Sequence, residues 1–169
     1  SRFTLATLPA QDFPKVESGQ NDAEFEVAQP QLRGLLDQVS FSMAQQDVRY
    51  FLNGMLLEVA PQHLRTVATD GHRLAMCTLE GAGAGSERMQ AIVPRKGVLE
   101  MSRLLDDGDD QVLLQLGGNH LRVTKGPYTL TTKLVDGKFP DYEKVVPKDL
   151  GRTITGDRAS LRQAFQRAS

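Results

Sequence analysis

The sequence predicts an α+β domain with internal pseudo-symmetry, which spans residues 22–148. Three observations predict this class: the same order of elements occurs twice, each copy contains one amphipathic helix, and strands joined by turn residues fill the rest. Each copy consists of a strand, a helix and three further strands, in roughly 55 residues. Two such copies can pair their strands into antiparallel sheets and cover one side with the two helices.

The first copy opens with a short strand, in which Phe25 and Val27 alternate with glutamates. Pro30 suits the first turn of a helix, and the apolar residues after it recur at helical spacing, which predicts a helix over about 30–43. Asp70-Gly71 is typical of a tight hairpin turn between the last two strands of this copy. The strands that follow the helix are predicted over residues 49–59, 64–69 and 72–79.

The second copy opens with a strand over residues 89–93, which is followed by Pro94. A helix is predicted next, over about 95–105, and its apolar stripe consists of Val98, Met101, Leu104 and Leu105. The acidic run 106–110 predicts a solvated turn beyond this helix, because negative charge is unfavourable at a helix C-terminus. The remaining strands are predicted over residues 111–116, 119–125 and 128–134.

The two ends of the chain resemble pieces of neighbouring domains. Residues 2–8 alternate polar and apolar side chains as if a strand were entered midway, and Asp157 is a candidate N-cap of a helix near the C-terminus. We therefore expect a fragment in three parts, residues 1–21, 22–148 and 149–169. Frayed ends of an ordinary domain are the alternative.

Composition excludes several classes of protein. The 169 residues are 40% hydrophobic and 24% charged, as in ordinary globular domains, which argues against disorder and collagen. The apolar runs are far shorter than the ~20 residues of a membrane-spanning helix. One cysteine, Cys77, excludes an internal disulfide, and its apolar neighbours predict a buried thiol rather than a nucleophile.

Basic side chains gather in two stretches of a chain whose net charge is -1. Residues 88–103 and residues 152–169 each hold four cations. Charge separated in this way can give a near-neutral protein one face for a polyanion. Solvated helix faces without a partner are the alternative.

Residues 69–73 are the strongest candidate for chemistry. Asp70 and His72 could act as an acid–base pair or as metal ligands. The hairpin turn explains Asp70, however, and His72 would then begin the returning strand together with Arg73. His63 and His120 show no spacing that would complete a metal site. We predict no metal, no cofactor and no catalytic residue, with a hydrolase as the enzyme alternative.

Two irregular segments carry weaker signals. The Gly- and Ala-rich segment 80–86 offers no side chain for a core, so we expect it to be mobile, and it lacks the Lys-Ser/Thr pair of a phosphate loop. Segment 135–147 contains two prolines and is either a linker packed on the core or one wall of a peptide groove. The residues alone favour the linker.

Four blocks of the sequence carry a family resemblance. They are FSMAQQDVRYFLNG (41–54), RTVATDGHRLA (65–75), VPRKG (93–97) and KLVDGKFPDY (133–142). In this order they resemble the bacterial sliding clamps, the beta subunits of DNA polymerase III. The resemblance implies a DNA-clamp fold with three similar domains, each built from two strand–helix–three-strand repeats. This chain would hold the end of the first domain, the whole second domain and the start of the third.

The resemblance implies a non-catalytic scaffold in the bacterial cytoplasm, associated with the nucleoid. Family members are processivity factors: two chains join head to tail into a ring around duplex DNA and tether the polymerase. The helices over 30–43 and 95–105 would line the hole, where cations face phosphates without reading bases. The residues placed near DNA by the resemblance are Gln46, Arg49, Tyr50, Phe51, Arg95 and Lys96. Family members often carry Tyr where Phe51 stands.

The resemblance also implies a shallow apolar pocket for short peptide motifs of the polymerase III alpha subunit, the clamp-loader delta subunit, other polymerases and repair proteins. Such a pocket takes a Leu or Phe anchor, while a few polar groups orient the peptide. Its second-domain wall would consist of Leu52, Thr69, Gly71, His72, Arg73, Leu74, Pro140, Lys144 and Val145. The other wall belongs to the third domain, so we expect weak peptide binding and no ring from this chain alone. A free-standing peptide- or nucleic-acid-binding module is the alternative.

Overall fold

The computed structural model describes residues 2–13, 21–148 and 151–168. It divides into two compact units, Ser1–Phe139 and Pro140–Ser169. The helices are η1 (Ala10–Asp12), α1 (Gln29–Asp37), η2 (Ser40–Ser42), η3 (Tyr50–Leu52), α2 (Arg95–Leu104), α3 (Tyr142–Val145) and α4 (Arg158–Ala168). The strands are β1 (Asn21–Ala28), β2 (Gly54–Val59), β3 (His63–Thr69), β4 (Leu74–Glu80), β5 (Met89–Pro94), β6 (Gln111–Gly117), β7 (His120–Lys125) and β8 (Tyr128–Lys133). None of the helices in these ranges has the length and hydropathy needed to span a bilayer.

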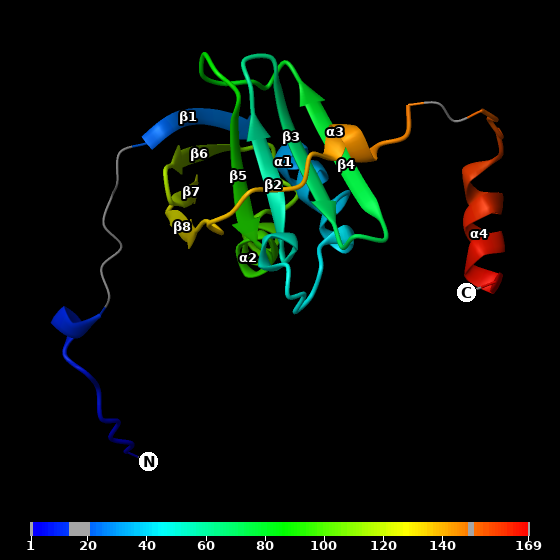
Figure 1. Cartoon of the computed structure of the whole chain (residues 1–169). Coiled ribbons are helices and arrows are strands. Elements are labelled where there is room, and N and C mark those ends of the chain that lie inside the picture. The colour runs from blue at the N-terminus through cyan, green and yellow to red at the C-terminus, as the bar shows by residue number, and fades with distance from the viewer. Residues whose placement is uncertain (1, 14–20, 149–150, 169) are drawn as a thin grey trace. The chain divides into compact units, whose positions relative to one another are not determined.

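The strands of the described residues form two antiparallel sheets, which exchange one strand between the repeats (Figure 1). One sheet has the order β1-β6-β7-β8 and the other has the order β4-β3-β2-β5. Each sheet therefore combines the three-strand meander of one repeat with the first strand of the other. The predicted α+β class and the twofold order of elements are confirmed.

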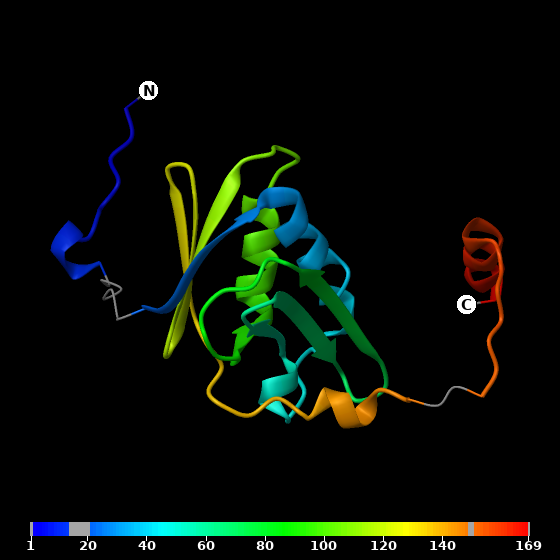
Figure 2. The same cartoon turned by 90° about the horizontal axis from the view of Figure 1, so that it is seen from above.

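Helices α1 and α2 lie side by side and pack against the sheets (Figure 2). Helix α1 contacts β1, β3 and β4, while α2 contacts β2, β5 and β8. Their apolar stripes, which include Leu32, Leu35, Val98 and Met101, are buried in one core with the inward side chains of both sheets. Burying each such side chain stabilises the fold by about 1.5–3 kcal/mol. The helical periodicity therefore identified the core face of each helix correctly.

The first helix is shorter than predicted. It ends at Asp37 rather than near residue 43, and η2 follows as a separate turn. Val39 and Met43 are nevertheless buried in the core, because the chain turns back toward the sheets after the helix. Apolar spacing predicted the burial of these side chains but not the point at which the helix ends.

Two predicted strands also differ from the structure. The strand predicted from residue 49 begins at Gly54, because residues 50–52 form η3. Residues 2–8 form no strand and are exposed. A strand needs a neighbour for its hydrogen bonds, and no described segment pairs with these residues. Alternation alone therefore overestimated strand content.

The segment 80–86 is hydrogen-bonded rather than free. The amide of Gly81 donates to the carbonyl of Gln62 at 2.7 Å, and the amide of Ala84 donates to the carbonyl of Ala60 at 3.0 Å. A Cβ on Gly83 would collide with the same Ala60 carbonyl, so glycine permits this close approach. Two main-chain bonds therefore tie a segment with small side chains to residues 60–62, and its mobility stays a prediction.

The acidic turn after α2 lies beyond the helix as predicted, and it is also tied to the first repeat. Gln29 is fully buried; its Oε1 accepts from the amide of Asp106 at 2.9 Å, and its Nε2 donates to the carbonyl of Gly108 at 3.2 Å. Lys125 Nζ lies 2.5 Å from Asp106 Oδ2. These contacts join the start of α1, the turn and β7.

We expect the Asp106 carboxylate to remain charged to low pH. The hydrogen bond from Lys125, followed by that from the Gly108 amide, lowers the pKa of Asp106 from 3.8 to about 2. The contribution of this pair to stability is therefore complete above the ordinary pKa and is lost as the pH falls through about 2. A carbon-13 NMR titration of the carboxyl carbon measures the midpoint. Lys125→Met should move it back toward 3.8, and an ordinary midpoint in the unsubstituted protein would contradict the prediction.

The second unit contains α3 and α4. Asp157 caps α4 as predicted: its Oδ1 accepts from the amide and from the hydroxyl of Ser160, both at 2.8 Å. These bonds lower the pKa of the Asp157 carboxyl. Leu161 and Phe165 of α4 are exposed within this unit.

Candidate functional site

The connection between β3 and β4 is a four-residue loop, residues 70–73, rather than a two-residue turn. His72 and Arg73 therefore lie in the loop, and the prediction that they begin the returning strand is wrong. Asp70 explains the longer loop, because its Oδ1 accepts from the amides of both His72 and Arg73 at 3.0 Å. A carboxylate that bonds the following amides stabilises a turn of this kind.

Further hydrogen bonds close this loop at its base. Thr69, which is buried, donates its hydroxyl to the carbonyl of Arg73 at 2.7 Å and accepts from the amide of Gly71 at 3.1 Å. Gly71 has a φ of +89°, which a residue with a Cβ adopts only under strain. The loop backbone is thus fixed, while the side chains of His72 and Arg73 are exposed. The Arg73 guanidinium lies 5.7 Å from the centroid of the Phe41 ring.

The contacts of Asp70 argue against the hydrolase alternative. The amides of His72 and Arg73 hold the pKa of its carboxyl below the usual value, so it is a poor proton acceptor at neutral pH. In the described part of the chain, no three His, Cys, Asp or Glu side chains gather as metal ligands. Cys77 is half-buried rather than buried, with its Sγ 3.6 Å from Gln38 Oε1.

A second loop, residues 46–53, lies against the first. The side chain of Arg49 donates from Nη2 to the carbonyl of Asp70 at 3.2 Å. The same guanidinium binds both carboxylate oxygens of Asp47, from Nε at 3.0 Å and from Nη2 at 2.8 Å. These bonds, together with one from the Arg49 amide, lower the pKa of Asp47 to about 2. Sequence reasoning did not single out Asp47, although it stands next to residues that the resemblance placed near DNA.

The structure brings the residues predicted to face DNA onto two connected segments. Gln46 and Tyr50 are exposed, and the rings of Tyr50 and Phe51 meet edge to face at 5.7 Å. Arg95 and Lys96 form the first turn of α2, and the amide of Arg95 donates to the carbonyl of Asn53 at 3.0 Å. The second loop and the start of α2 are therefore directly bonded.

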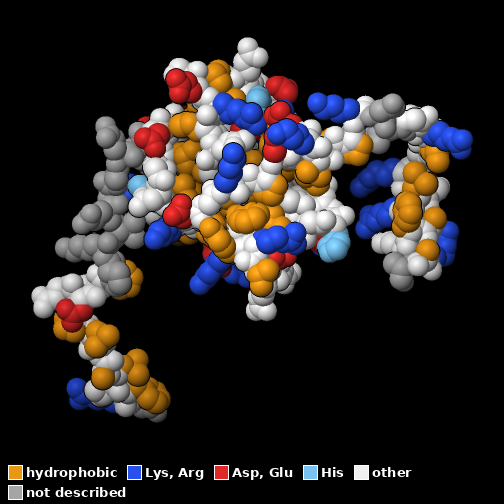
Figure 3. All heavy atoms as spheres, in the orientation of Figure 1, with side chains coloured by type: hydrophobic (Ala, Val, Ile, Leu, Met, Phe, Trp, Pro, Cys, Tyr) orange, Lys and Arg blue, Asp and Glu red, His pale blue; other side chains and the backbone are white. Residues whose placement is uncertain are grey.

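Ion pairs engage half of the cations in the basic stretch 88–103. Arg88 pairs with Glu58 at 2.6 Å, and Arg103 pairs with Glu100 at 2.7 Å. The two other cations of this stretch, at positions 95 and 96, are those that the resemblance placed near DNA. On the face of the first unit seen in Figure 3, Lys and Arg side chains lie among exposed apolar side chains.

The residues predicted for the peptide pocket fall into both units. Those of the first unit, Leu52, Thr69, Gly71, His72, Arg73 and Leu74, lie on η3, at the adjoining ends of β3 and β4, and in the loop between these strands. Leu52 is buried and Leu74 is half-buried, whereas the loop residues are exposed. The second unit holds Pro140, Lys144 and Val145. Lys144 pairs with Asp141 at 2.8 Å, and Val145 is exposed.

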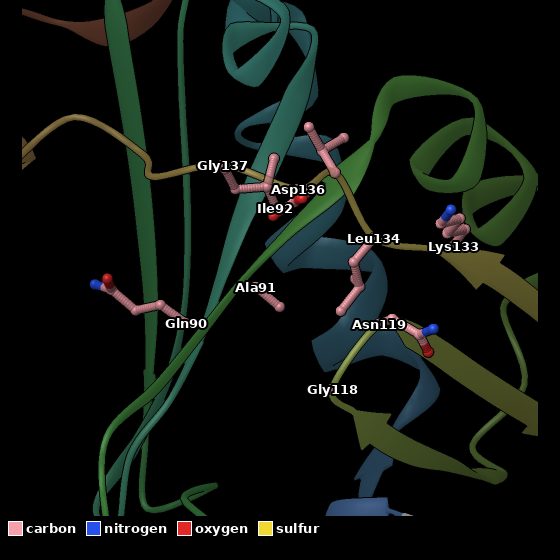
Figure 4. Close-up of a pocket in the computed structure, with 10 residues that line it drawn as sticks. Gln90, Ala91, Ile92, Gly118, Asn119, Lys133, Leu134, Asp136 and Gly137 are labelled. Carbon is pink, nitrogen blue, oxygen red and sulfur yellow. The ribbon is translucent and has the colours of Figure 1, made fainter. Parts of the chain in front are cut away.

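The structure also contains a pocket that the sequence did not indicate. It has a volume of about 480 Å³ and lies between β5, the β6–β7 turn and the segment after β8 (Figure 4). Val135 donates its amide to the carbonyl of Ile92 at 2.9 Å, and residues 135–137 form one wall. The start of segment 135–147 therefore packs on the sheet and also lines a pocket.

Comparisons with known proteins agree on one family. The family model described as DNA polymerase III beta subunit, central domain, matches residues 26–141. The beta sliding clamps of Pseudomonas aeruginosa and Escherichia coli K12 are 58% and 48% identical over 169 residues, which is the whole of this chain and 46% of each of those proteins. The chain thus spans less than half the length of these curated relatives.

Solved structures give the same result. The crystal structure of the DNA polymerase III subunit beta from Pseudomonas aeruginosa matches 99% of this chain and 46% of its own length, with a TM-score of 0.94 and 59% identity. A DnaN sliding clamp of the same organism bound to griselimycin has a TM-score of 0.92 and 59% identity over 99% of this chain and 45% of that one. The chain therefore belongs to the family of DNA polymerase III beta subunits, with residues 26–141 corresponding to the family's central domain.

Proposed function

We propose that the full-length protein carrying this sequence is the processivity factor of the replicative DNA polymerase. It forms a homodimeric ring around duplex DNA in the bacterial cytoplasm, close to the nucleoid, and acts as a scaffold without catalysis or cofactor. The observation that carries this proposal is the match of the whole chain to proteins named beta sliding clamp. The contacts that commit Asp70 to a turn support a non-catalytic role.

The domain organisation follows from the same proposal. Residues 1–21 form the end of the first clamp domain, residues 22–148 form the whole second domain and residues 149–169 begin the third. The strand exchange between the two repeats supports the middle assignment, because the strands of both sheets lie between Asn21 and Lys133, which is nearly the same range. This chain alone lacks most of two domains in this organisation and does not close a ring.

The proposed DNA-facing surface consists of the second loop and the first turn of α2. Its residues are Gln46, Arg49, Tyr50, Phe51, Arg95 and Lys96. Cations at a helix start can contact phosphates without reading bases, as a protein that slides along duplex DNA requires. The bond between Arg95 and Asn53 supports this surface, because it joins its two segments.

The proposed peptide surface is centred on the loop 70–73. A peptide anchor would pack near Leu52 and Leu74, beside the polar groups of Thr69, Gly71, His72 and Arg73. The family resemblance assigns Pro140, Lys144 and Val145 of the second unit to the same binding role. Its partners are the polymerase alpha subunit, the clamp-loader delta subunit, other polymerases and repair proteins. A fixed loop backbone with exposed side chains suits this role, because less freedom is lost on binding. The relative with bound griselimycin supports a ligand site in this family.

The experiment that tests the peptide surface is a titration of the full-length protein with a polymerase-derived clamp-binding peptide. We expect His72→Ala and Leu74→Ala each to weaken binding about tenfold, as for truncation of a central interface side chain. Tyr128→Ala is the control, because this exposed residue lies on β8 in the other sheet. Circular dichroism should show an unchanged fold. Unaltered affinity in both variants would mean that the peptide surface is assigned wrongly.

A further titration separates the two-walled pocket from a self-sufficient module. We expect clear peptide binding by the full-length protein and little by this chain, because the third domain supplies the other wall. Equal binding by both would place the whole site within residues 22–148.

A further inference from the structure

Asp47 forms several hydrogen bonds within the second loop. Its Oδ1 accepts from the amide of Arg49 at 2.8 Å and from Arg49 Nε at 3.0 Å, and its Oδ2 accepts from Arg49 Nη2 at 2.8 Å. The backbone of Asp47 is fixed as well, since Asn53 Oδ1 accepts from its amide at 2.9 Å and Asn53 Nδ2 donates to its carbonyl at 2.8 Å. The two bonds from Arg49 Nε and Nη2 to the Asp47 carboxylate hold the guanidinium in one orientation.

The oriented side chain of Arg49 also contacts the loop 70–73. Its Nη2 donates to the carbonyl of Asp70 at 3.2 Å, and a Cβ built on Gly71 would lie 2.9 Å from its Nη1. The guanidinium therefore lies directly against the backbone of the loop 70–73. A glycine at position 71 permits both the positive φ of the loop and this close approach.

The charge of Arg49 is largely offset where it lies. The Asp47 carboxylate contacts it at two points, and the bonds that Arg49 donates keep this carboxylate ionised because they lower its pKa to about 2. A cation paired in this way attracts a phosphate less than an unpaired one does. The geometry therefore gives Arg49 a role at the neighbouring loop in addition to its place on the proposed DNA-facing surface.

We propose that Asp47 is a positioning residue for the peptide surface: it orients Arg49, and Arg49 holds the loop 70–73 in the place where an extended peptide with an apolar anchor binds. The inference rests on the proposed function of that loop. It also links the segment proposed to face DNA with the segment proposed to face peptide, through two adjacent side chains.

The test compares charge-preserving and charge-removing variants of the full-length protein in the same peptide titration. Arg49→Lys keeps the positive charge but loses the planar fork that reaches two partners at once. We expect Asp47→Ala and Arg49→Lys each to weaken peptide binding about fivefold, which corresponds to about 1 kcal/mol. Val48→Ala is the matched control, because Val48 stands between Asp47 and Arg49 in the sequence and its side chain is 95% exposed. It should leave peptide binding unchanged.

Duplex-DNA affinity, measured over a series of salt concentrations, distinguishes positioning from phosphate binding. We expect Asp47→Ala not to weaken DNA binding, because it removes a negative charge and leaves Arg49 in place, so that a loss of peptide affinity in this variant cannot come from lost phosphate contacts. The double variant Asp47→Ala/Arg49→Lys should bind peptide no more weakly than either single variant, since both act through one contact. Additive losses, or wild-type peptide affinity in Arg49→Lys, would overturn the inference.

The His72→Ala variant shows which proposal has failed. Normal peptide binding in Asp47→Ala together with weakened binding in His72→Ala would reject the positioning role alone. Normal binding in both variants would reject the peptide surface itself, and the positioning role with it. Melting temperatures within a degree or so of the unsubstituted protein exclude loss of fold as the cause of weaker binding.

Discussion

Glu58→Ala is expected to lower the free energy of unfolding by about 3 kcal/mol, because it removes the centre of a buried ion-pair cluster. Glu58 lies on β2 and is 1% exposed. Its carboxylate contacts two residues of β3, the residue that precedes β5 and one residue of β5. The contacts are His63 Nε2 at 3.0 Å, Arg65 Nη1 at 3.6 Å, Arg88 Nη2 at 2.6 Å and Gln90 Nε2 at 2.7 Å.

The size of this effect follows from the position of the cluster. Strand β5 comes from the second repeat, whereas β2 and β3 come from the first, so Glu58 joins the repeats where they exchange a strand. Without the carboxylate, both Arg65 and Arg88 would lose an ion-pair partner in a partly desolvated site.

Urea unfolding of Glu58→Ala and of a matched control, Glu100→Ala, measures the change in the free energy of unfolding. Glu100→Ala is the control, because Glu100 also pairs with an arginine, at 2.7 Å, but on the exposed face of α2. An exposed pair contributes less than about 1 kcal/mol. Equal losses in Glu58→Ala and Glu100→Ala would show that burial adds nothing to this carboxylate.

Gly54→Ala is expected to destabilise the fold by about 2 kcal/mol, because it overpacks the junction of β2 and β5. A Cβ at this position would lie 2.5 Å from the carbonyl oxygen of Val93 and 3.1 Å from Ile92 Cγ2. The first of these is a backbone atom of the paired strand, so it cannot rotate away. The added methyl group would have to push the strands apart at the edge of the core.

Gly34→Ala provides a control with the opposite sign. Gly34 lies inside α1, and no described atom outside its own helix and chain neighbours lies within 4 Å of an added Cβ. Replacing an interior helical glycine by alanine stabilises a helix by about 0.5–1 kcal/mol, because the unfolded chain loses freedom. Thermal melting should therefore rise for Gly34→Ala and fall for Gly54→Ala. A fall in both would refute the steric argument at position 54.

Local patterns in the sequence predicted the local structure well. The stripes of α1 and α2 were found because a helix buries side chains at a fixed spacing, and the Asp157 cap was found because capping involves neighbours in sequence. The loop 70–73 was predicted too short, because Asp-Gly fits a two-residue turn equally well. The two extra residues are fixed by bonds from the Asp70 side chain to the amides that follow.

Contacts between distant segments were not predictable in the same way. The exchange of β1 and β5 depends on which strands pair, and the alternation within each strand is the same for either partner. The bond from Arg49 to Asp70 joins two loops whose spacing follows no periodic rule. One signal was available for the buried cluster: Glu58 is a charged residue within the apolar run 54–60.

The strand exchange has a consequence for how such a unit assembles. Each repeat consists of one strand, a helix and a three-strand meander. A repeat on its own would leave the edge of its meander and its first strand without a strand to pair with. A free half could complete its sheets by exchanging that strand with another copy, which is the arrangement of a domain-swapped dimer. The present chain holds the two partners in one polypeptide, so their association is unimolecular and does not depend on protein concentration.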